Sequence, residues 1–393
     1  MQACKKNIAI EGVMEILLLG YSLNGKTMLK DKKFAMAEMP FFRVYSKQST
    51  IDDVYEALRR SVEQSLESDI GLFLSGGLDS RIIAGLVAES TKDIVAFTFG
   101  GYNEQMIAKK VCSILKLHHV TVKLPPLDLE LLAHIKKIVR EMGGDYNLRE
   151  TYVNTTLGKQ LSRIGVKEVV SGIGFDEVNC GMNAAEVYSK ASFIRFLVGR
   201  SHPFLPQKYR EVVSRNLAEY CETIEFRKLF PSVIVRNRLL RQLKIREWIH
   251  RRAPLINSEV LGAICSLPYH ERLNKRMQKK ILCRYFPKLY RIPYSMSLLF
   301  PSFPYIVHRG VNKMVQELCI QTQLKRQCPL DTGGPSDYYF FRSNFRMLRL
   351  LLLKHLPPLF KLEDVKYLID NLNSKNATLL NRMAIYSMIC EQE

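Results

Sequence analysis

The stretch LFLSGGLDSRIIAGL, residues 72–86, decides the fold of this chain. An apolar run leads into the pair Gly76-Gly77, and apolar residues then recur four positions apart, as at Ile82 and Leu86. A short apolar run bounded by glycines is typical of a buried parallel strand, and the four-residue spacing is typical of a helix. The glycines are therefore predicted to form the turn between a strand and the helix that follows it.

The flanking sequence repeats this alternation of strands and helices. Further strands are predicted within residues 94–101, 118–124 and 166–174, and helices over 50–68, 104–115 and 152–165, the first of them with Thr50 as its N-cap. Before residue 42, Asn24-Gly25 predicts a hairpin turn, and beyond about residue 185 the pattern is mostly helical. Alternating elements imply right-handed crossovers. We therefore expect an α/β fold, a doubly wound parallel sheet with a mostly helical C-terminal extension.

The residues of the first turn suit an anion. Amides at the start of a helix point outward and the helix dipole favours negative charge, so a phosphate can bind there. Gly76 and Gly77 permit a close backbone approach, Ser75 and Ser80 add hydroxyl groups, and Asp79 is a candidate magnesium ligand. The turn is not a P-loop, because no Lys-Ser or Lys-Thr pair follows the glycines.

A second turn of the same kind lies in VVSGIGFDEVNCG, residues 169–181. Ser171 and Gly172 follow an apolar strand and offer more groups to a polyphosphate, while Asp176 offers a second carboxylate to the same metal. Parallel strands bring both turns to one edge of the sheet, where open α/β sheets bind their ligands. The two turns are therefore predicted to form one site.

The first turn, Ser75 to Ser80, resembles the signature of the PP-loop ATP pyrophosphatases, and the second turn resembles the second signature of asparagine synthetases. The resemblance implies an adenine nucleotide alpha hydrolase-like fold that uses ATP and Mg²⁺ and splits ATP into AMP and pyrophosphate while adenylating a carboxylate. It also implies that Phe73 and Phe99 flank the adenine.

Two later segments resemble the same family. Residues 251–274 are similar to the stretch that follows its variable helical region, although Asn257 stands where an aspartate is common. Residues 279–293 are similar to its lysine-and-arginine helix, with Lys280 and Arg284 one turn apart. The resemblance implies that Lys280 meets the charge of the phosphate or the acyl-adenylate, or that Lys279 does if the register differs by one residue.

The second turn also departs from the family pattern. Between its two glycines asparagine synthetases usually have an acid that looks like the group handling protons as ammonia attacks, and this chain has Ile173. An isoleucine can neither accept a proton nor stabilise ammonium, and loss of a positioned base costs about 10²- to 10⁴-fold in rate. Either Glu177 or a neighbouring side chain takes that role, or the adenylate passes to another amine.

Residues 1–48 resemble the tail of a glutaminase domain, with an ATP-binding α/β core expected over 49–190 and a helical part of the synthetase domain over 191–393. The family's glutaminase uses a cysteine at its processed N-terminus, whereas this chain begins Met1-Gln2-Ala3-Cys4, and the residues before Ser75 are too few for a complete domain of that kind. We therefore expect nitrogen to arrive as free ammonia or from a separate glutaminase subunit.

The composition indicates which classes of partner and which compartment to expect. The net charge of +20 attracts polyanions, whether a nucleotide, a nucleic acid or anionic lipid. The basic stretch at residues 236–252 leaves contact with RNA or with a membrane surface open. No uncharged run is long enough to cross a bilayer and no secretory leader is visible, so neither a membrane nor export is expected and the cytoplasm is the predicted compartment. Nine cysteines without a CxxC pair indicate neither a zinc site nor a disulfide framework.

These observations favour adenylation of a carboxylate, with aspartate and ammonia as the leading substrates. Three alternatives stay open: an amide- or lactam-forming ligase with another amine, a tRNA-modifying PP-loop enzyme, and a nucleotide-binding relative without catalysis.

Overall fold

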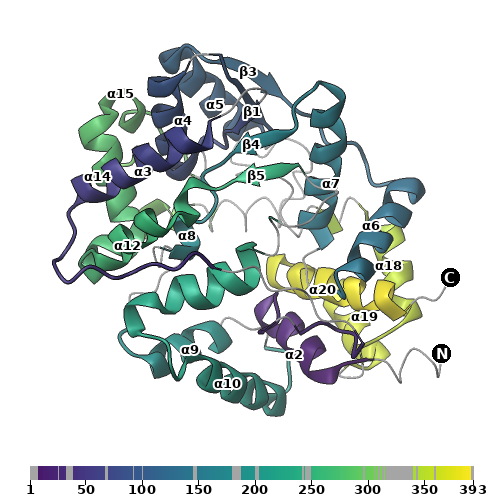
Figure 1. The fold of residues 1–393 in the computed structure, drawn as a ribbon. Coiled ribbons are helices and arrows are strands. Elements are labelled where there is room, and N and C mark those ends of the chain that lie inside the picture. Colours follow the sequence, from purple (N-terminus) through teal and green to yellow (C-terminus); the bar gives the residue numbers. More distant parts are fainter. Residues whose placement is uncertain are drawn as a thin grey trace.

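The central sheet is parallel, as the sequence predicts (Figure 1). Among the described residues five strands form one sheet in the order β3-β2-β1-β4-β5, and every pairing is parallel. The strands are β1 (Ile70–Phe73), β2 (Val95–Thr98), β3 (His118–Thr121), β4 (Glu168–Val170) and β5 (His250–Arg252). The computed structural model describes residues 8–24, 26–31, 39–66, 70–91, 93–99, 101–144, 148–178, 187–199, 203–240, 243, 249–294, 297–304, 306–308, 310–311, 314, 340–341, 344–357 and 360–390.

Helices cover both faces of this sheet, which makes it doubly wound as expected. Leu72, Ala96 and Val170 lie side by side in the strand register and join one buried cluster, while Phe97 and Val169 join a second. The first cluster includes residues of α3 (Ile51–Ser65), α4 (Leu78–Ser90), α5 (Tyr102–Leu115), α12 (Ser258–Ser266) and α14 (Arg276–Tyr285). The second includes residues of α6 (Leu129–Glu141) and α7 (Leu148–Arg163).

The predicted start of the first long helix is confirmed in atomic detail. The Thr50 hydroxyl accepts from the backbone N–H of Asp53 at 3.3 Å, and the Asp53 carboxylate accepts from the Thr50 N–H at 2.8 Å. This reciprocal capping satisfies backbone donors that a helix start leaves without partners. Val54, Leu58 and Val62, the residues at four-residue spacing, are all buried.

Strand β5 lies in the part of the chain that is expected to be mostly helical, and no strand is predicted there. Its sequence is His-Arg-Arg, which has no apolar run that would mark a strand. Its side chains contact β4 through polar groups: Glu168 accepts from Arg252 Nε, and the Glu168 carboxylate lies 3.0 Å from His250 Nδ1.

Several of the remaining helices form a second layer beside the sheet. The purple N-terminal helix α2 (Ile10–Leu19) packs against α10 and the yellow C-terminal helix α20 (Figure 1). The other helices are α8 (Phe175–Val178), α9 (Lys190–Gly199), α10 (Gln207–Cys221), a π-helix (Pro231–Leu239), α13 (Tyr269–Arg272), α15 (Pro287–Tyr290), α18 (Phe345–Lys354), α19 (Leu362–Asp370), α20 (Ser374–Cys390), and short 3-10 turns at Phe226–Lys228, Pro254–Ile256 and Leu273–Lys275.

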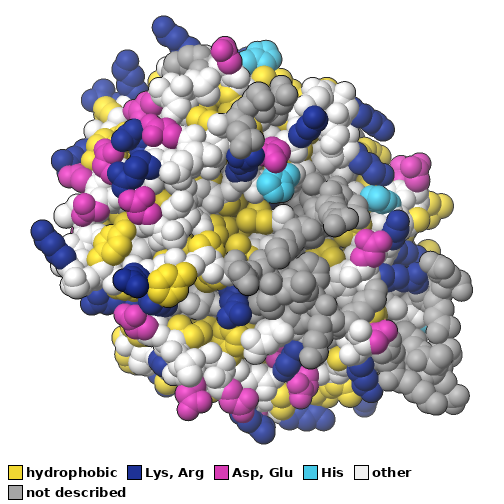
Figure 2. All heavy atoms as spheres, viewed as in Figure 1, with side chains coloured by type: hydrophobic (Ala, Val, Ile, Leu, Met, Phe, Trp, Pro, Cys, Tyr) yellow, Lys and Arg dark blue, Asp and Glu magenta, His cyan; other side chains and the backbone are white. Residues whose placement is uncertain are grey.

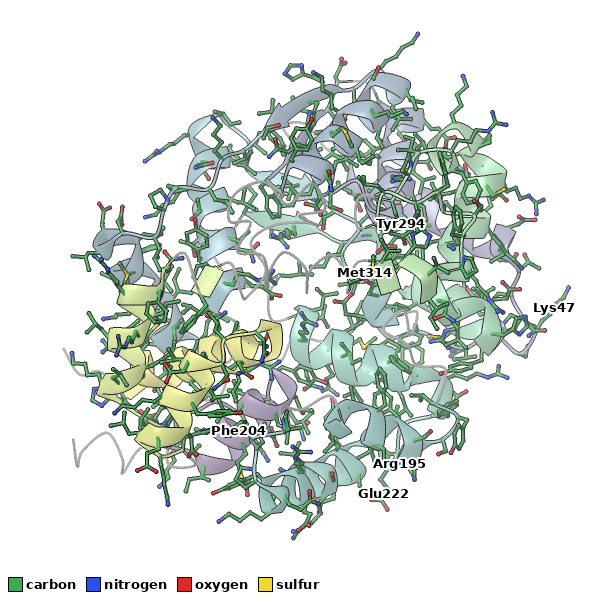
Figure 3. All side chains as sticks on the ribbon, turned by 180° about the vertical axis from the view of Figure 1, so that it is seen from behind. Lys47, Arg195, Phe204, Glu222, Tyr294 and Met314 are labelled. Carbon is green, nitrogen blue, oxygen red and sulfur yellow. The ribbon has the colours of Figure 1, made fainter. Side chains whose placement is uncertain are left out.

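Aromatic contacts hold parts of this layer together. In the view from behind, Phe204 lies beside the yellow C-terminal helices, and its ring centroid is 5.2 Å from that of Tyr367 on α19 (Figure 3). At the predicted hairpin turn, Asn24 has φ +53° and an isolated antiparallel bridge joins Ile8 to Leu29, while Gly25 lies outside the described residues. In the part of the chain that the structure describes, no helix combines the length and the apolar character needed to cross a membrane.

A fully buried arginine ties the first glycine turn to a distant segment. Arg81 Nε donates to the Gly76 carbonyl at 3.0 Å, and its terminal nitrogens donate to the carbonyls of Leu289 at 3.2 Å, Ile292 at 2.7 Å and Pro293. Burial lowers the pKa of Arg81 to about 10, so the guanidinium stays charged at neutral pH. The glycine turn is therefore anchored from beneath by a cation that it does not present to solvent.

Arg81→Met should destabilise the fold by about 3 kcal/mol, because the shorter apolar side chain leaves buried carbonyl oxygens without donors. Urea unfolding measures this loss. Arg60→Met removes a surface guanidinium that pairs with Glu259 and should cost less than about 1 kcal/mol. Equal effects of the two substitutions would contradict the anchoring role of Arg81.

Candidate active site

Both glycine turns line one pocket at the carboxyl edge of the sheet. They follow β1 and β4, and it is between these neighbouring strands that the strand order reverses, the place where open α/β sheets bind ligands. The pocket has a volume of about 250 Å³ and is lined by Phe73, Leu74, Ser75, Asp79, Ser80, Thr98, Phe99, Glu104, Ser171, Gly172, Ile173 and Arg251. The structure thus gathers most of the predicted nucleotide-binding residues around one cavity.

The first turn presents backbone amides and hydroxyl groups to this pocket. Gly76 has φ +70°, and a Cβ there would come within 2.8 Å of the Ile107 side chain, so the position favours glycine. Gly77 is the N-cap of α4, and no side chain caps that helix. The hydroxyl oxygens of Ser75 and Ser80 lie 3.1 Å apart. The turn has the uncapped amides and paired hydroxyls that an anion site needs.

The second turn lies directly against the first. A Cβ on Gly172 would come within 2.9 Å of the backbone carbon of Asp79 and 3.0 Å of the Ser80 nitrogen. Only glycine permits this approach without movement of the backbone. The buried Ser171 hydroxyl has no hydrogen-bond partner among the described residues, which leaves it available to a ligand in the pocket.

A lysine joins the two predicted metal ligands. The Lys275 ammonium lies 2.7 Å from Asp79 Oδ2 and 2.8 Å from Asp176 Oδ1. Gln278 Nε2 donates to the other oxygen of Asp79 at 3.3 Å. Each turn therefore contributes one carboxylate to a pair, Asp79 and Asp176. The positive charge that neutralises this pair comes from Lys275, immediately before α14.

Burial raises the pKa of Asp79 to about 6. The nearby Lys275 ammonium opposes this rise, and the Asp176 carboxylate adds to it. Burial also raises the pKa of Glu177, and the nearby Arg238 guanidinium opposes that rise. Carboxyl groups whose pKa is raised in a cleft are frequent at functional sites.

The structure does not bring Lys280 or Arg284 to the two aspartates. Lys280 is exposed and pairs with Glu271 at 2.6 Å, and Arg284 is exposed and pairs with Asp52 at 2.7 Å. Lys279, the alternative register, donates to the Phe303 carbonyl at 2.6 Å, and burial lowers its pKa. The lysine at the carboxylates is Lys275, which precedes the helix on which a basic residue was expected.

The two phenylalanines form one wall of the pocket. The rings of Phe73 and Phe99 meet edge to face, with centroids 5.5 Å apart. The Arg251 guanidinium lies 5.1 Å from the centre of the Phe73 ring, and it also donates to the Asn154 side chain. An aromatic wall with a stacked guanidinium suits a planar base.

Ile173 lies in the pocket, where its apolar side chain takes no part in proton transfer. Glu177 is on the short helix α8 and is not among the described residues that line the pocket. Glu104, at the start of α5, does line it. Glu104 thus offers the pocket a carboxylate besides that of Asp79, whereas the sequence indicates only Glu177 and leaves a neighbouring side chain open.

Comparison with known proteins gives a family match for the segment that contains both turns. Residues 53–244, which contain both glycine turns, match the asparagine synthase family model. The chain carries a domain of the asparagine synthase family. It is also 31% identical over 175 residues to a protein of Methanocaldococcus jannaschii that carries the provisional name asparagine synthetase (glutamine-hydrolyzing) 2. That match covers 42% of this chain and 33% of the relative, so the chain matches about a third of the relative's length.

The carboxylates of this asparagine synthase domain fit a magnesium ion that is bound together with a substrate phosphate. Among the described residues no group of three or more His, Cys, Asp or Glu side chains is placed to hold a metal ion. Mg²⁺ typically binds through one or two carboxylates and completes its shell with water and substrate phosphates. Asp79 and Asp176, beside turns suited to a polyphosphate, are a donor set of that kind.

Several residues of the domain's site were missed by sequence reasoning. Lys275, Gln278, Arg251 and Glu104 stand in no motif that distinguishes them from surface residues. The sequence signal for Lys275 is the preceding Asn274. Asparagine often adopts the left-handed backbone conformation, so it could have marked the turn in which Lys275 lies. Asn257 caps α12 by accepting from the Glu259 N–H at 2.8 Å, a role that asparagine and aspartate fill equally well.

The stability of the domain should depend on pH through Asp79. The pKa of this carboxyl is raised from 3.8 to about 6 in the fold, so its contribution is fully present below about pH 4 and is lost as the pH rises through 6. Relative to Asp79→Asn, the free energy of unfolding of the natural chain should fall by up to about 3 kcal/mol between pH 4 and pH 7.

Urea unfolding at several pH values, without nucleotide or divalent cation, measures this difference. Asp93→Asn, at an exposed carboxyl outside the site, is the matched control. A constant difference between the natural chain and Asp79→Asn across the range would contradict the assignment.

Proposed function

We propose that this chain is an ATP-dependent, AMP-forming carbon–nitrogen ligase that adenylates a carboxylate, with aspartate as the first candidate, and passes the acyl group to ammonia. The observation that carries the proposal is the contact between the two glycine turns at the Gly172 position. It makes one pocket of two anion-binding turns, an aromatic wall and a pair of carboxylates. The family match to residues 53–244 supports the same reaction class.

The polyphosphate of ATP would bind across the two turns. The amides at the start of α4 and the hydroxyls of Ser75, Ser80 and Ser171 are its donors, while Phe73 and Phe99 flank the adenine. Asp79 and Asp176 would hold Mg²⁺, which supplies charge neutralisation at the phosphates. The fixed amides and hydroxyls orient the α-phosphate and stabilise charge that develops on the departing pyrophosphate.

In the first step a carboxylate oxygen of the substrate attacks the α-phosphorus. The new P–O bond gives an acyl-adenylate, and the bond to pyrophosphate breaks with its electron pair on the pyrophosphate. A cation near these oxygens lowers the barrier, and we assign this role to Lys275, which lies at the carboxylates, rather than to Lys280 or Arg284.

In the second step the lone pair of ammonia attacks the acyl carbon, AMP leaves with the C–O bonding electrons, and the new amide nitrogen loses a proton. Ile173 cannot take that proton. Glu104 lines the pocket and is our candidate for it, in preference to Glu177. The ammonia would come free from solution or from a glutaminase partner.

A role on RNA receives less support. Arg238 of the basic stretch lies 3.3 Å from the Glu150 carboxylate, and Arg251 and Arg252 donate to Asn154 and Glu168. On the face shown in Figure 2, Lys and Arg side chains are spread out with Asp and Glu among them. These three arginines are engaged within the fold, which favours a structural use of their charge over phosphate binding. Residues 241–242 and 244–248 of the basic stretch lie outside the described residues.

Purified protein with Mg-ATP, aspartate and ammonium should release AMP and form asparagine. Asp79→Asn should keep the fold but reduce AMP formation by at least about 100-fold, because the turn remains while its charged ligand is lost. Separation of AMP from ADP, together with an amino-acid assay, measures both products.

Asp93→Asn is the control and should match the natural chain. AMP without asparagine would retain adenylation and point to another amine, whereas full turnover by Asp79→Asn would overturn the site assignment.

Ile173→Glu should raise asparagine formation from ammonium by about tenfold or more relative to AMP release, because it places an acid between the two glycines of the second turn. Ile173→Gln has a similar size without the charge and serves as the control. An unchanged ratio of asparagine to AMP in Ile173→Glu would show that proton handling does not limit the use of ammonia.

A further inference from the structure

The Lys275 ammonium lies where a metal ion shared by the two aspartates would lie. It is within 2.8 Å of one oxygen from each carboxylate, and its side chain is 7% exposed. Gln278 donates to the second oxygen of Asp79. The carboxylates of Asp79 and Asp176, which a divalent cation would bind, are thus already paired with the side chains of Lys275 and Gln278.

The backbone around Lys275 is held in an unusual conformation. Asn274 and Lys275 have φ values of +55° and +59°, so two consecutive non-glycine residues adopt the left-handed region. This conformation costs free energy for a lysine and persists only where the surroundings hold it. The two ion pairs supply that hold, and helix α14 begins immediately afterwards at Arg276.

An ammonium group and a divalent cation cannot occupy the same position between two carboxylates. Displacing the ammonium leaves a lysine without its buried counter-charges, which is costly. A bound polyphosphate changes this balance, because it offers phosphate oxygens both to the metal and to the displaced ammonium.

Building on the proposed function, we propose that Lys275 has a second role before the nucleotide binds, in which its ammonium keeps divalent cations out of the nucleotide-free site. The metal then enters only together with the polyphosphate. The residue holds Asp79 and Asp176 at a fixed spacing until the nucleotide arrives, so the site never carries two uncompensated carboxylates.

Binding of Mn²⁺ alone to the nucleotide-free chain tests this inference. Electron paramagnetic resonance of free Mn²⁺ measures the affinity without any turnover. The natural chain should bind Mn²⁺ weakly, and Lys275→Gly should bind it at least about tenfold more tightly, because the ammonium is gone. Glycine also suits φ +59°, so this variant removes backbone strain and is designed to fold.

Two further variants separate charge from structure. Lys275→Arg keeps the positive charge and should remain weak in Mn²⁺ binding, whereas Lys275→Met should resemble Lys275→Gly. Lys288→Met removes one exposed lysine on α15 and controls for the change in net charge. Mn²⁺ should also raise the thermal midpoint of Lys275→Gly and leave that of the natural chain unchanged.

Tight Mn²⁺ binding by the natural chain without nucleotide would overturn the inference, and so would equal Mn²⁺ affinity in Lys275→Gly and the natural chain. The proposed function fails separately, through the absence of AMP. A tenfold gain in Mn²⁺ affinity in Lys275→Gly would support the role of Lys275 even in a chain that adenylates nothing.

Discussion

The contact between Gly172 and the backbone of Asp79 and Ser80 is the constraint on which the rest of the site depends. It leaves no room for a Cβ, and it brings the second turn of the chain against the first. The turns follow two adjacent parallel strands, so the register of β1 and β4 brings both turns to the same edge of the sheet. The glycine at position 172 then allows the turns to touch. The carboxylates of Asp79 and Asp176 are then close enough to share one ammonium group.

Two cations stabilise this arrangement. Arg81 ties the Gly76 carbonyl to carbonyls of α15 and of the segment that follows it, and Lys275 joins the two aspartates. Lys275 and the distant carbonyls that Arg81 contacts lie within residues 275–293, more than 190 positions along the chain. The helical second half of the chain is therefore part of the site and not only a cover for the sheet.

Much of this could be predicted from the sequence, because apolar runs and glycines have local signatures. Four strands, the Thr50 cap and the meeting of the two turns follow from periodicity and from the edge rule for parallel strands. Strand β5 could not be predicted, since its His-Arg-Arg sequence has no apolar run and its side chains contact Glu168 through polar groups. The lysine at the aspartates was also missed, because a helix pattern says which residues share a face but not which of them reaches a partner 196 positions away.

The most direct test of the account is a crystal structure with Mg²⁺ and α,β-methylene ATP, which binds like ATP but cannot release pyrophosphate. The account predicts the adenine against the wall formed by Phe73 and Phe99, and the phosphates in contact with both Ser75–Gly77 and Ser171–Gly172. It also predicts the metal at Asp79 and Asp176, with the Lys275 ammonium moved onto a phosphate oxygen. Phosphates bound to one turn alone, or outside the pocket, would contradict the claim that the two turns form a single adenylating site.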